Sequence, residues 1–513
     1  MQRRPVEQPV PHPRGRRCRS RPNPAAVRSA PPRGPLPAGG GPGPLYGAVR
    51  TPAEHGEHRH CCSDGTSGPF VGRCPTGNRH TAAALGHTHR ARTRRPGGVR
   101  RTPAPDRRLT TTPGSPSVPP TAARAVPTTW HPQVFEPFPG ESRLLFGRVA
   151  ARSPQFDTTT SAGGQRVLIG SAAGTEAAEV AVRARGELLE RLGNVLAGRA
   201  AEASAALVAT YAELRRRRAP ALDPAPWSGP EGRTARQLWV MGRSLLSGTE
   251  ILVPAALAFL QHRPPAGCTA PVRVGSTGLA AHPDRSTAVE HAAWEILERD
   301  LLRRSWQAPA EHPPAAAGVL GALPPPLGRV CERLGLHATA LTLPAPGACV
   351  VAVCLHTPDG REQTFGARCG PATDRADLLA RAAYEALMVR WSMSTPAAHR
   401  AYQRLALTGA PASAVEHALW TYHGGQDALA RWLHHGVAAP EAPRVDPAAF
   451  VDPMAAVDPV RLLAEHTADD VLALDTAPAE LREEHVAVVR LLSPGARPLP
   501  SVATPGTPPH PFG

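Results

Sequence analysis

Two short acidic motifs are the residues of this chain whose types and spacing could do chemistry. ELLER begins at Glu187 and EILER at Glu295, and each holds Glu, Glu and Arg at i, i+3 and i+4. On a helix these three side chains share one face. If the two faces meet, they crowd four carboxylates, which is costly unless a cation lies among them. The carboxylates are Glu187, Glu190, Glu295 and Glu298, and the arginines are Arg191 and Arg299.

Magnesium fits such a place. Mg²⁺ takes oxygen ligands from carboxylates and phosphates, and guanidinium groups meet phosphate oxygens with fork geometry. The two motifs therefore predict a nucleotide-phosphate site with Glu187, Glu190, Glu295 and Glu298 as metal ligands. The alternative is a solvated helix face, which Glu and Arg at these spacings commonly decorate; the duplication favours the site but leaves this alternative open.

The chain has no lysine, so the 58 residues counted as Lys or Arg are all arginines. This excludes the P-loop GxxxxGK[ST], the kinase strand lysine and a pyridoxal Schiff base. Any nucleotide site must therefore use arginines for phosphate charge and carboxylates for a metal.

The elements that must position these residues are helices and strands in alternation. Apolar spacing predicts helices over 176–203, 288–306 and 374–391, the first two of which carry the motifs. Residues 237–260 read as strands joined by glycine turns around Gly242 and Gly248, and strands are also predicted within 338–360, 471–477 and 485–495. We expect a mixed α/β fold with packed helices, starting near Arg143 and ending near Leu499.

The first 130 residues predict a disordered tail rich in Arg, Pro and Gly. They hold 22 of the 58 basic residues and 5 of the 42 acidic ones, so the excess charge lies in the tail and the remainder is nearly neutral. Such a segment cannot bury enough apolar surface to order itself. Its spacing around HRHCC fits no standard zinc pattern. We expect the true start to lie downstream, with residues 1–130 non-functional.

Other classes are disfavoured by what the sequence lacks. No RNA- or DNA-binding signature accompanies the arginines, so a nucleic-acid partner is not expected. No window of about 18 apolar residues and no signal-peptide core are present, and the 9 cysteines form no disulfide framework. These features predict a cytoplasmic protein without a membrane partner.

Several segments, in the correct order, resemble the YcaO family. VRARGELLER resembles the first glutamate helix of the family, and GSTGLAAHPDRSTAVEHAAWEILERD its Ser-x-Gly-Leu-Ala segment with the second. RADLLARAAYEALMVRW resembles its later helix, and WVMGRSLLSGTEILVPA its approach to the central strand. The chain departs from the family pattern at Arg183, Thr277 and Met388.

The resemblance implies a YcaO-like catalytic domain over residues 143–513 that binds ATP and Mg²⁺ and activates a peptide amide. Carried over position by position, it implies nine nucleotide-site residues: Glu187, Glu190, Arg191, Ser276, Glu295, Glu298, Arg299, Glu385 and Arg390. The end of the chain, TPPHPFG, resembles the Pro-x-Pro-x-Pro terminus of the azoline-forming branch. Pro509, Pro511 and Gly513 are therefore candidate catalytic residues, the terminal carboxylate acting as a general base; a solvated tail is the alternative.

The function implied is an ATP-dependent cyclodehydratase that forms thiazoline or oxazoline from Cys, Ser or Thr of a ribosomal precursor peptide, as in thiopeptide biosynthesis. Thioamide or amidine formation and a non-catalytic scaffold remain alternatives. The implied partners are the precursor peptide and a ThiF-like or other leader-peptide-binding protein, with a homodimer left open.

Overall fold

The computed structural model describes residues 130–158, 165–425, 427–434, 457–500 and 508–512. The tail up to residue 129, the HRHCC segment and Gly513 lie outside these described residues.

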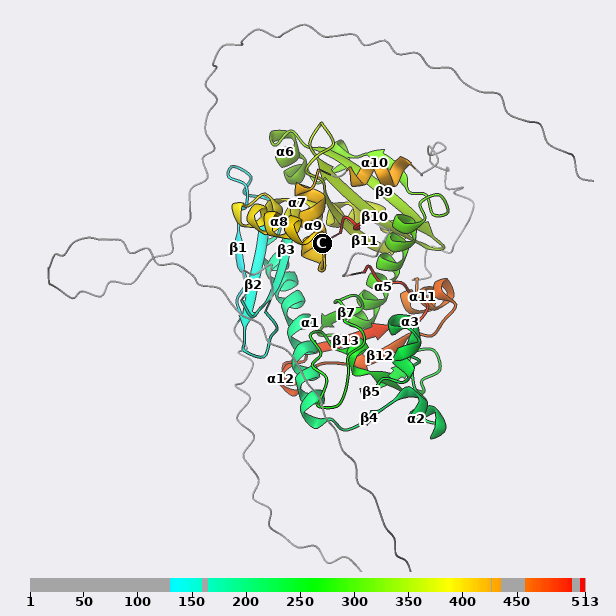
Figure 1. Cartoon of the computed structure of the whole chain (residues 1–513). Coiled ribbons are helices and arrows are strands. Elements are labelled where there is room, and N and C mark those ends of the chain that lie inside the picture. The colour runs from blue at the N-terminus through cyan, green and yellow to red at the C-terminus, as the bar shows by residue number, and fades with distance from the viewer. Residues whose placement is uncertain (1–129, 159–164, 426, 435–456, 501–507, 513) are drawn as a thin grey trace, which may run out of the picture. The chain divides into compact units, whose positions relative to one another are not determined.

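The strands in the described part of the chain form three antiparallel sheets (Figure 1). The first has the order β1-β2-β3, formed by Gln133–Phe135, Leu145–Arg152 and Val167–Gly174. The second has the order β11-β10-β9-β8, formed by Thr364–Pro371, Ala348–His356, His337–Ala345 and Ala315–Gly318. The three-residue strand β1 precedes Arg143, and no sequence pattern predicts it.

The third sheet has the order β4-β5-β12-β13-β7, with β6 paired to β5. Its strands are Val208–Ala209, Gln237–Ser244, Leu472–Asp475, Ala487–Leu492, Leu279–His282 and, for β6, Glu250–Pro254. Gly248, with φ of 73°, turns β5 into β6 as predicted. Gly242 instead lies within β5, where a Cβ would press against Val253 of β6 and Leu474 of β12. Residues Ala255–Ala258 form α4 where a strand is predicted.

Three long helices confirm the helical predictions: α1 (Ala177–Ser204), α5 (Arg285–Gln307) and α7 (Arg375–Met393). Shorter helices connect the sheets. They are α2 (Tyr211–Arg216), α3 (Ala225–Ser228), α6 (Pro325–Arg333), α8 (Pro396–Thr408), α9 (Ala414–His423), α10 (Ala428–His434), α11 (Pro459–Thr467) and α12 (Ala479–Glu483). No described helix combines the length and apolarity needed to cross a bilayer.

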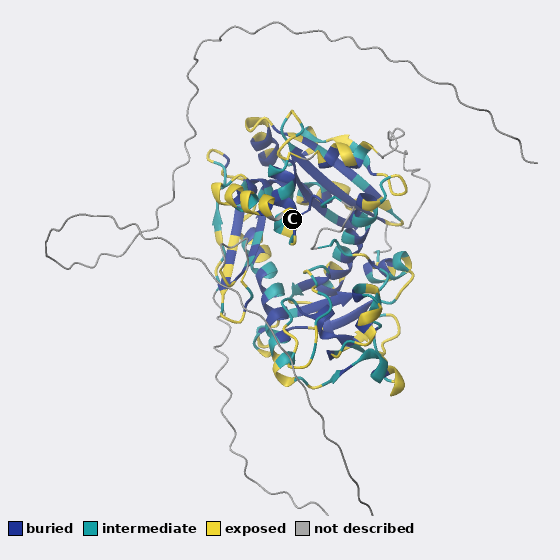
Figure 2. Cartoon of the chain, viewed as in Figure 1, coloured by how far each residue is buried: buried dark blue, intermediate teal, exposed yellow. Residues whose placement is uncertain are grey.

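The long helices pack on the sheets through apolar faces, which Figure 2 shows as buried. Helix α1 buries Val180, Ala184, Leu188 and Val195 against β2 and β3. Helix α7 packs on β10 and β11, and α5 contacts strands of both the second and the third sheet. Helix α5 thus shares one hydrophobic core with β10 and β11 of the second sheet and β13 of the third sheet.

Two glycines let helices approach strands unusually closely. A Cβ on Gly170 of β3 would overlap the backbone of α1 at Ala184, and one on Gly366 of β11 would overlap the backbone of α7 at Ala382. Only glycine permits such direct backbone packing. The same strand–helix contact is therefore made twice, once in each of two sheets.

Candidate nucleotide site

The two close strand–helix contacts hold a glutamate in the same way. Glu187 accepts a hydrogen bond from the Ser171 backbone N–H at 2.5 Å, directly after Gly170. Glu385 accepts one from the Ala367 backbone N–H at 3.3 Å, directly after Gly366. In both cases the glutamate follows the contacting alanine by three residues, so close packing presents its carboxylate to the strand amide. The structure therefore positions these carboxylates by main-chain bonds.

Glu295 is fixed by a comparable bond in the third sheet. Its carboxylate accepts from the Gly278 N–H at 3.0 Å, and Gly278 has a φ of 81° that favours glycine. The guanidinium of Arg490, on β13, donates to the Gly275 carbonyl at 2.9 Å. The predicted site residue Ser276 thus lies in a turn held between α5 and β13.

Charges from four secondary-structure elements converge at this place. Arg191 pairs with Glu187 at 2.6 Å, and Arg368 of β11 pairs with Glu385 at 2.6 Å. Arg299 has its Nε 3.4 Å from Glu298 and 3.9 Å from Glu295. The charge of Glu295 on α5 also acts on Glu190 and Arg191 of α1, so the motif faces of the two helices lie near each other.

The carboxylates are destabilised in their charged form. Burial raises the pKa of Glu190 well above its usual range, and the neighbouring Glu295 adds to that effect. Burial likewise raises the pKa of Glu295, against the lowering effect of Arg299. The pKa of Glu298 is raised to about 7 by burial, with Arg299 opposing the shift. A bound cation would remove this penalty.

Two buried polar atoms here have no hydrogen-bond partner among the described residues. Glu298 is 4% exposed, and its Oε1 accepts no hydrogen bond although Arg299 is near. The Nε of Arg490 donates to nothing, and burial lowers the pKa of this guanidinium to about 10. A buried carboxylate oxygen that accepts no hydrogen bond suits a cation, and a buried guanidinium N–H that donates none suits an anion. The residues present therefore fit a magnesium–phosphate group.

No three Asp, Glu, His or Cys side chains in the described part of the chain are gathered as one metal cage. Mg²⁺ is commonly held by only one or two carboxylates, with phosphates and water completing its shell. The arrangement is thus suited to magnesium that arrives with a nucleotide, and not to a metal bound by protein alone.

Arg390 lies apart from these charges. It donates to the Glu362 backbone carbonyl at 2.6 Å and pairs with the Glu362 carboxylate at 2.5 Å, and its guanidinium stands 5.4 Å from the ring centre of Tyr422. Among the described residues Arg390 makes no contact with the glutamates of the two motifs. Its role as a nucleotide ligand therefore stays a prediction.

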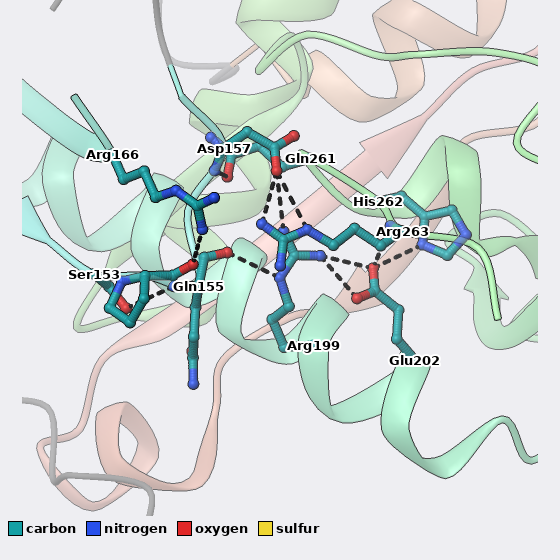
Figure 3. A network of polar contacts seen from close by, with 10 residues as sticks. Ser153, Gln155, Asp157, Arg166, Arg199, Glu202, Gln261, His262 and Arg263 are labelled. Carbon is teal, nitrogen blue, oxygen red and sulfur yellow. Dashed lines mark hydrogen bonds and ion pairs between the residues drawn. The ribbon is translucent and has the colours of Figure 1, made fainter. Parts of the chain in front are cut away.

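A polar network anchors the far end of α1, as Figure 3 shows. Arg199 donates to both oxygens of Glu202, at 2.9 and 2.8 Å, and to the Gln155 carbonyl at 3.1 Å. Glu202 also accepts from the Arg263 N–H at 2.7 Å, and Arg263 in turn donates to Asp157 at 2.8 Å. This network ties α1 to the β2–β3 connection and to the segment after α4, which fixes the helix that carries Glu187 and Glu190.

The C-terminal arm, residues 508–512, is packed into the fold. The ring of Phe512 is 2% exposed and lies 5.7 Å from Phe365 and 5.9 Å from Trp432, centroid to centroid. The Trp306 indole donates to the Pro508 carbonyl at 3.2 Å. The arm, which includes Pro509 and Pro511, is therefore docked and not a solvated tail.

His510 places this arm beside the charged site. Its ring stacks on His417 at 3.8 Å, and burial, the charge of His417 and the cations Arg299 and Arg303 hold its pKa at about 3. The charge of Arg299 thus acts on both the glutamates and His510 of the arm.

Sequence reasoning missed Arg368 and Arg490, which are on strands and outside every glutamate motif. A signal was present in each case. Arg490 is the one charge in the apolar run VAVVRLL, and Arg368 stands among small residues in FGARCG. A lone charge inside a strand that must be buried requires a partner, but the partner could not be named without the strand pairing.

A structure of a heterocyclase in complex with substrate and cofactor is similar to this chain, with a TM-score of 0.52, 17% identity and coverage of 72% of this chain. The chain spans about half the length of that heterocyclase, 50%. A YcaO protein from Methanopyrus kandleri bound with AMPPCP and Mg²⁺ gives a TM-score of 0.45 and 19% identity, covering 74% of this chain and 90% of that one. An uncharacterised protein from Methanothermobacter thermautotrophicus is 36% identical over 62 residues, 12% of this chain and 16% of the relative.

Residues 170–497 match the model of one protein family, described as YcaO cyclodehydratase, ATP- and Mg²⁺-binding. The matched range covers well over half of the chain and includes all three glutamate helices and both strand arginines. The chain belongs to the YcaO family of ATP- and Mg²⁺-binding enzymes.

Proposed function

We propose that this protein is an ATP-dependent cyclodehydratase that converts Cys, Ser or Thr residues of a ribosomal precursor peptide into thiazoline or oxazoline. The observation that carries the proposal is the convergence of glutamates from α1, α5 and α7 with strand arginines in a chain that has no lysine. Family membership supports ATP as the co-substrate.

In the proposed reaction the substrate thiol or hydroxyl adds to the preceding amide carbonyl, and its proton passes to a base. The oxyanion so formed attacks the terminal phosphorus of ATP, and ADP leaves. The C–O bond then breaks with departure of phosphate, the amide nitrogen loses its proton, and a C=N bond closes the azoline. The peptide loses one water in total, and its oxygen leaves with the phosphate.

The chain's own residues would act through charge and position. Amide oxygen is a poor leaving group, so a site that stabilises phosphoryl transfer meets the main chemical need. Arg191 and Arg299 would neutralise phosphate charge, and Glu187, Glu190, Glu295 and Glu298 are the proposed holders of magnesium. Bound Mg²⁺ would supply further neutralisation of the triphosphate.

The base is proposed to come from the end of the chain. Docking of Phe512 and the effect of the Arg299 charge on the pKa of His510 support the proposal that the C-terminal carboxylate, that of Gly513, acts at the same site. Pro509 and Pro511 would limit the conformations of the arm and so lower the entropy lost on docking.

The test is incubation with ATP, Mg²⁺, a precursor peptide and its leader-binding partner, followed by intact mass measurement. The expected result is loss of one water mass per ring with one phosphate released for each. A gain in mass from sulfur exchange would indicate thioamide formation instead. Unchanged peptide with no phosphate release would contradict the proposal.

A further inference from the structure

Arg368 is the side chain that connects all three glutamate helices. It pairs with Glu385 of α7, and its charge is also felt by Glu295 and Glu298 of α5, while Glu187 of α1 acts on it in turn. No other described arginine interacts with glutamates from all three helices. The charge of Arg368 is therefore coupled to glutamates of all three helices.

The strand geometry gives this side chain a fixed starting point. Gly366, Arg368 and Gly370 lie on the same face of β11, the face that meets α7. A Cβ on either glycine would press into α7. Between these two glycines Arg368 supplies the side chain on this strand face, with the α7 backbone packed against Gly366 and the Leu378 side chain against Gly370. Such packing restrains the guanidinium better than a loop could.

Most of the hydrogen-bonding capacity of Arg368 is unused. Its Nη1 donates to the Ala367 carbonyl at 2.7 Å and to Glu385 at 2.6 Å. Among the described residues nothing accepts from its Nε or Nη2. The side chain keeps 40% of its surface accessible, so a ligand can reach it.

Arg191 differs from Arg368 in that protein groups already engage both of its terminal nitrogens. It pairs with Glu187 through Nη2 and donates to the Ile169 carbonyl through Nη1 at 2.6 Å, so both of its terminal nitrogens are engaged. Arg368 uses one nitrogen for both of its bonds and leaves the fork open. An open guanidinium fork beside carboxylates is complementary to a phosphate group that brings a cation with it.

We infer that Arg368 binds the β- or γ-phosphate of the nucleotide, which AMP lacks, through its Nε–Nη2 edge. This inference rests on the proposal that the nucleotide lies among the glutamates of α1, α5 and α7. Glu385 would act as the positioning residue that holds Nη1 and so orients the open edge.

The experiment is calorimetric titration of the full chain with two probes, a non-hydrolysable ATP analogue with Mg²⁺, and AMP. For Arg368→Met the affinity for the triphosphate should fall about tenfold or more, since hydrogen bonds to charged groups are lost, while AMP affinity stays within about twofold. Arg368→Lys keeps the charge without the fork and should recover only part of the affinity. The matched control is Arg361→Met, whose side chain is 74% exposed and, among the residues that the structure describes, pairs with Asp359 alone, at 3.7 Å.

Three results would overturn the inference: no greater loss for Arg368→Met than for the control, an equal loss for AMP, or full recovery with lysine. If Arg368→Met does not fold, the lysine variant still decides, because full triphosphate affinity with lysine contradicts a role for the fork. Glu190→Gln separates this inference from the location of the site. Unchanged nucleotide binding in Glu190→Gln would refute the location, whereas loss there with none in the Arg368 variants would refute Arg368 alone.

Discussion

Replacing Phe512 by Ala should release the C-terminal arm from the fold. The ring is 2% exposed and contacts Phe365 and Trp432. Burial of a phenylalanine side chain contributes about 2–3 kcal/mol. Each aromatic pair adds about 0.5–1.5 kcal/mol, and Phe→Ala changes in cores cost about 3–5 kcal/mol. A loss of this size shifts the docked-to-released ratio by at least about 100-fold.

Trimming by a carboxypeptidase reports the released arm, because slow cleavage follows the equilibrium population of the open form. Rates for the protein are divided by rates for free peptides of residues 501–513 with Phe or Ala, which corrects for the changed cleavage site. The normalised rate should rise by up to the same factor for Phe512→Ala and stay unchanged for Leu407→Ala, whose side chain is 88% exposed. Equal normalised rates for wild type and Phe512→Ala would refute the docking energetics.

Two further predictions concern titratable groups. Burial alone would raise the pKa of Asp300, but bonds from His466, Arg304 and the Arg497 N–H lower it. The ionised Asp300 therefore stabilises the fold at pH values above its pKa in the unfolded chain, and this stabilisation is lost as the pH falls through its pKa in the folded protein. Asp300→Asn should lower the free energy of unfolding by about 3–5 kcal/mol, measured by urea unfolding at neutral pH. A loss near zero would contradict this prediction. The pKa of His510 is lowered to about 3 by burial, so docking should be strongest above about pH 6.5 and weaken about tenfold per unit below it. Carboxypeptidase trimming should show this slope in wild type and lose it in His510→Gln, and a flat wild-type profile would exclude it.

The sequence predicts the three helices that carry the glutamates because helical periodicity and charge spacing are local properties. The same holds for the strands β9, β10, β12 and β13. Convergence of ELLER with EILER follows from duplication and family resemblance. Local pattern alone cannot supply it, since it depends on which sheets α1 and α5 cover.

The rest depends on pairing between distant segments. Arg368 and Arg490 enter the site through the register of β11 and β13, which no single segment encodes. Gly170 and Gly366 read as ordinary strand glycines until the helices are placed on them. The arm docks because Phe365, Trp306 and Trp432, far apart in sequence, meet around Phe512 and Pro508.

The central claim, that the glutamates of α1 and α5 hold a magnesium-bound nucleotide, is tested most directly at Glu298. Its buried charge is costly, as its pKa of about 7 indicates, so Glu298→Gln should fold at least as stably as wild type. Calorimetry with Mg²⁺ and a non-hydrolysable ATP analogue should show affinity reduced about tenfold or more, with the exposed control Glu465→Gln unchanged. Wild-type affinity in a folded Glu298→Gln protein would contradict the claim.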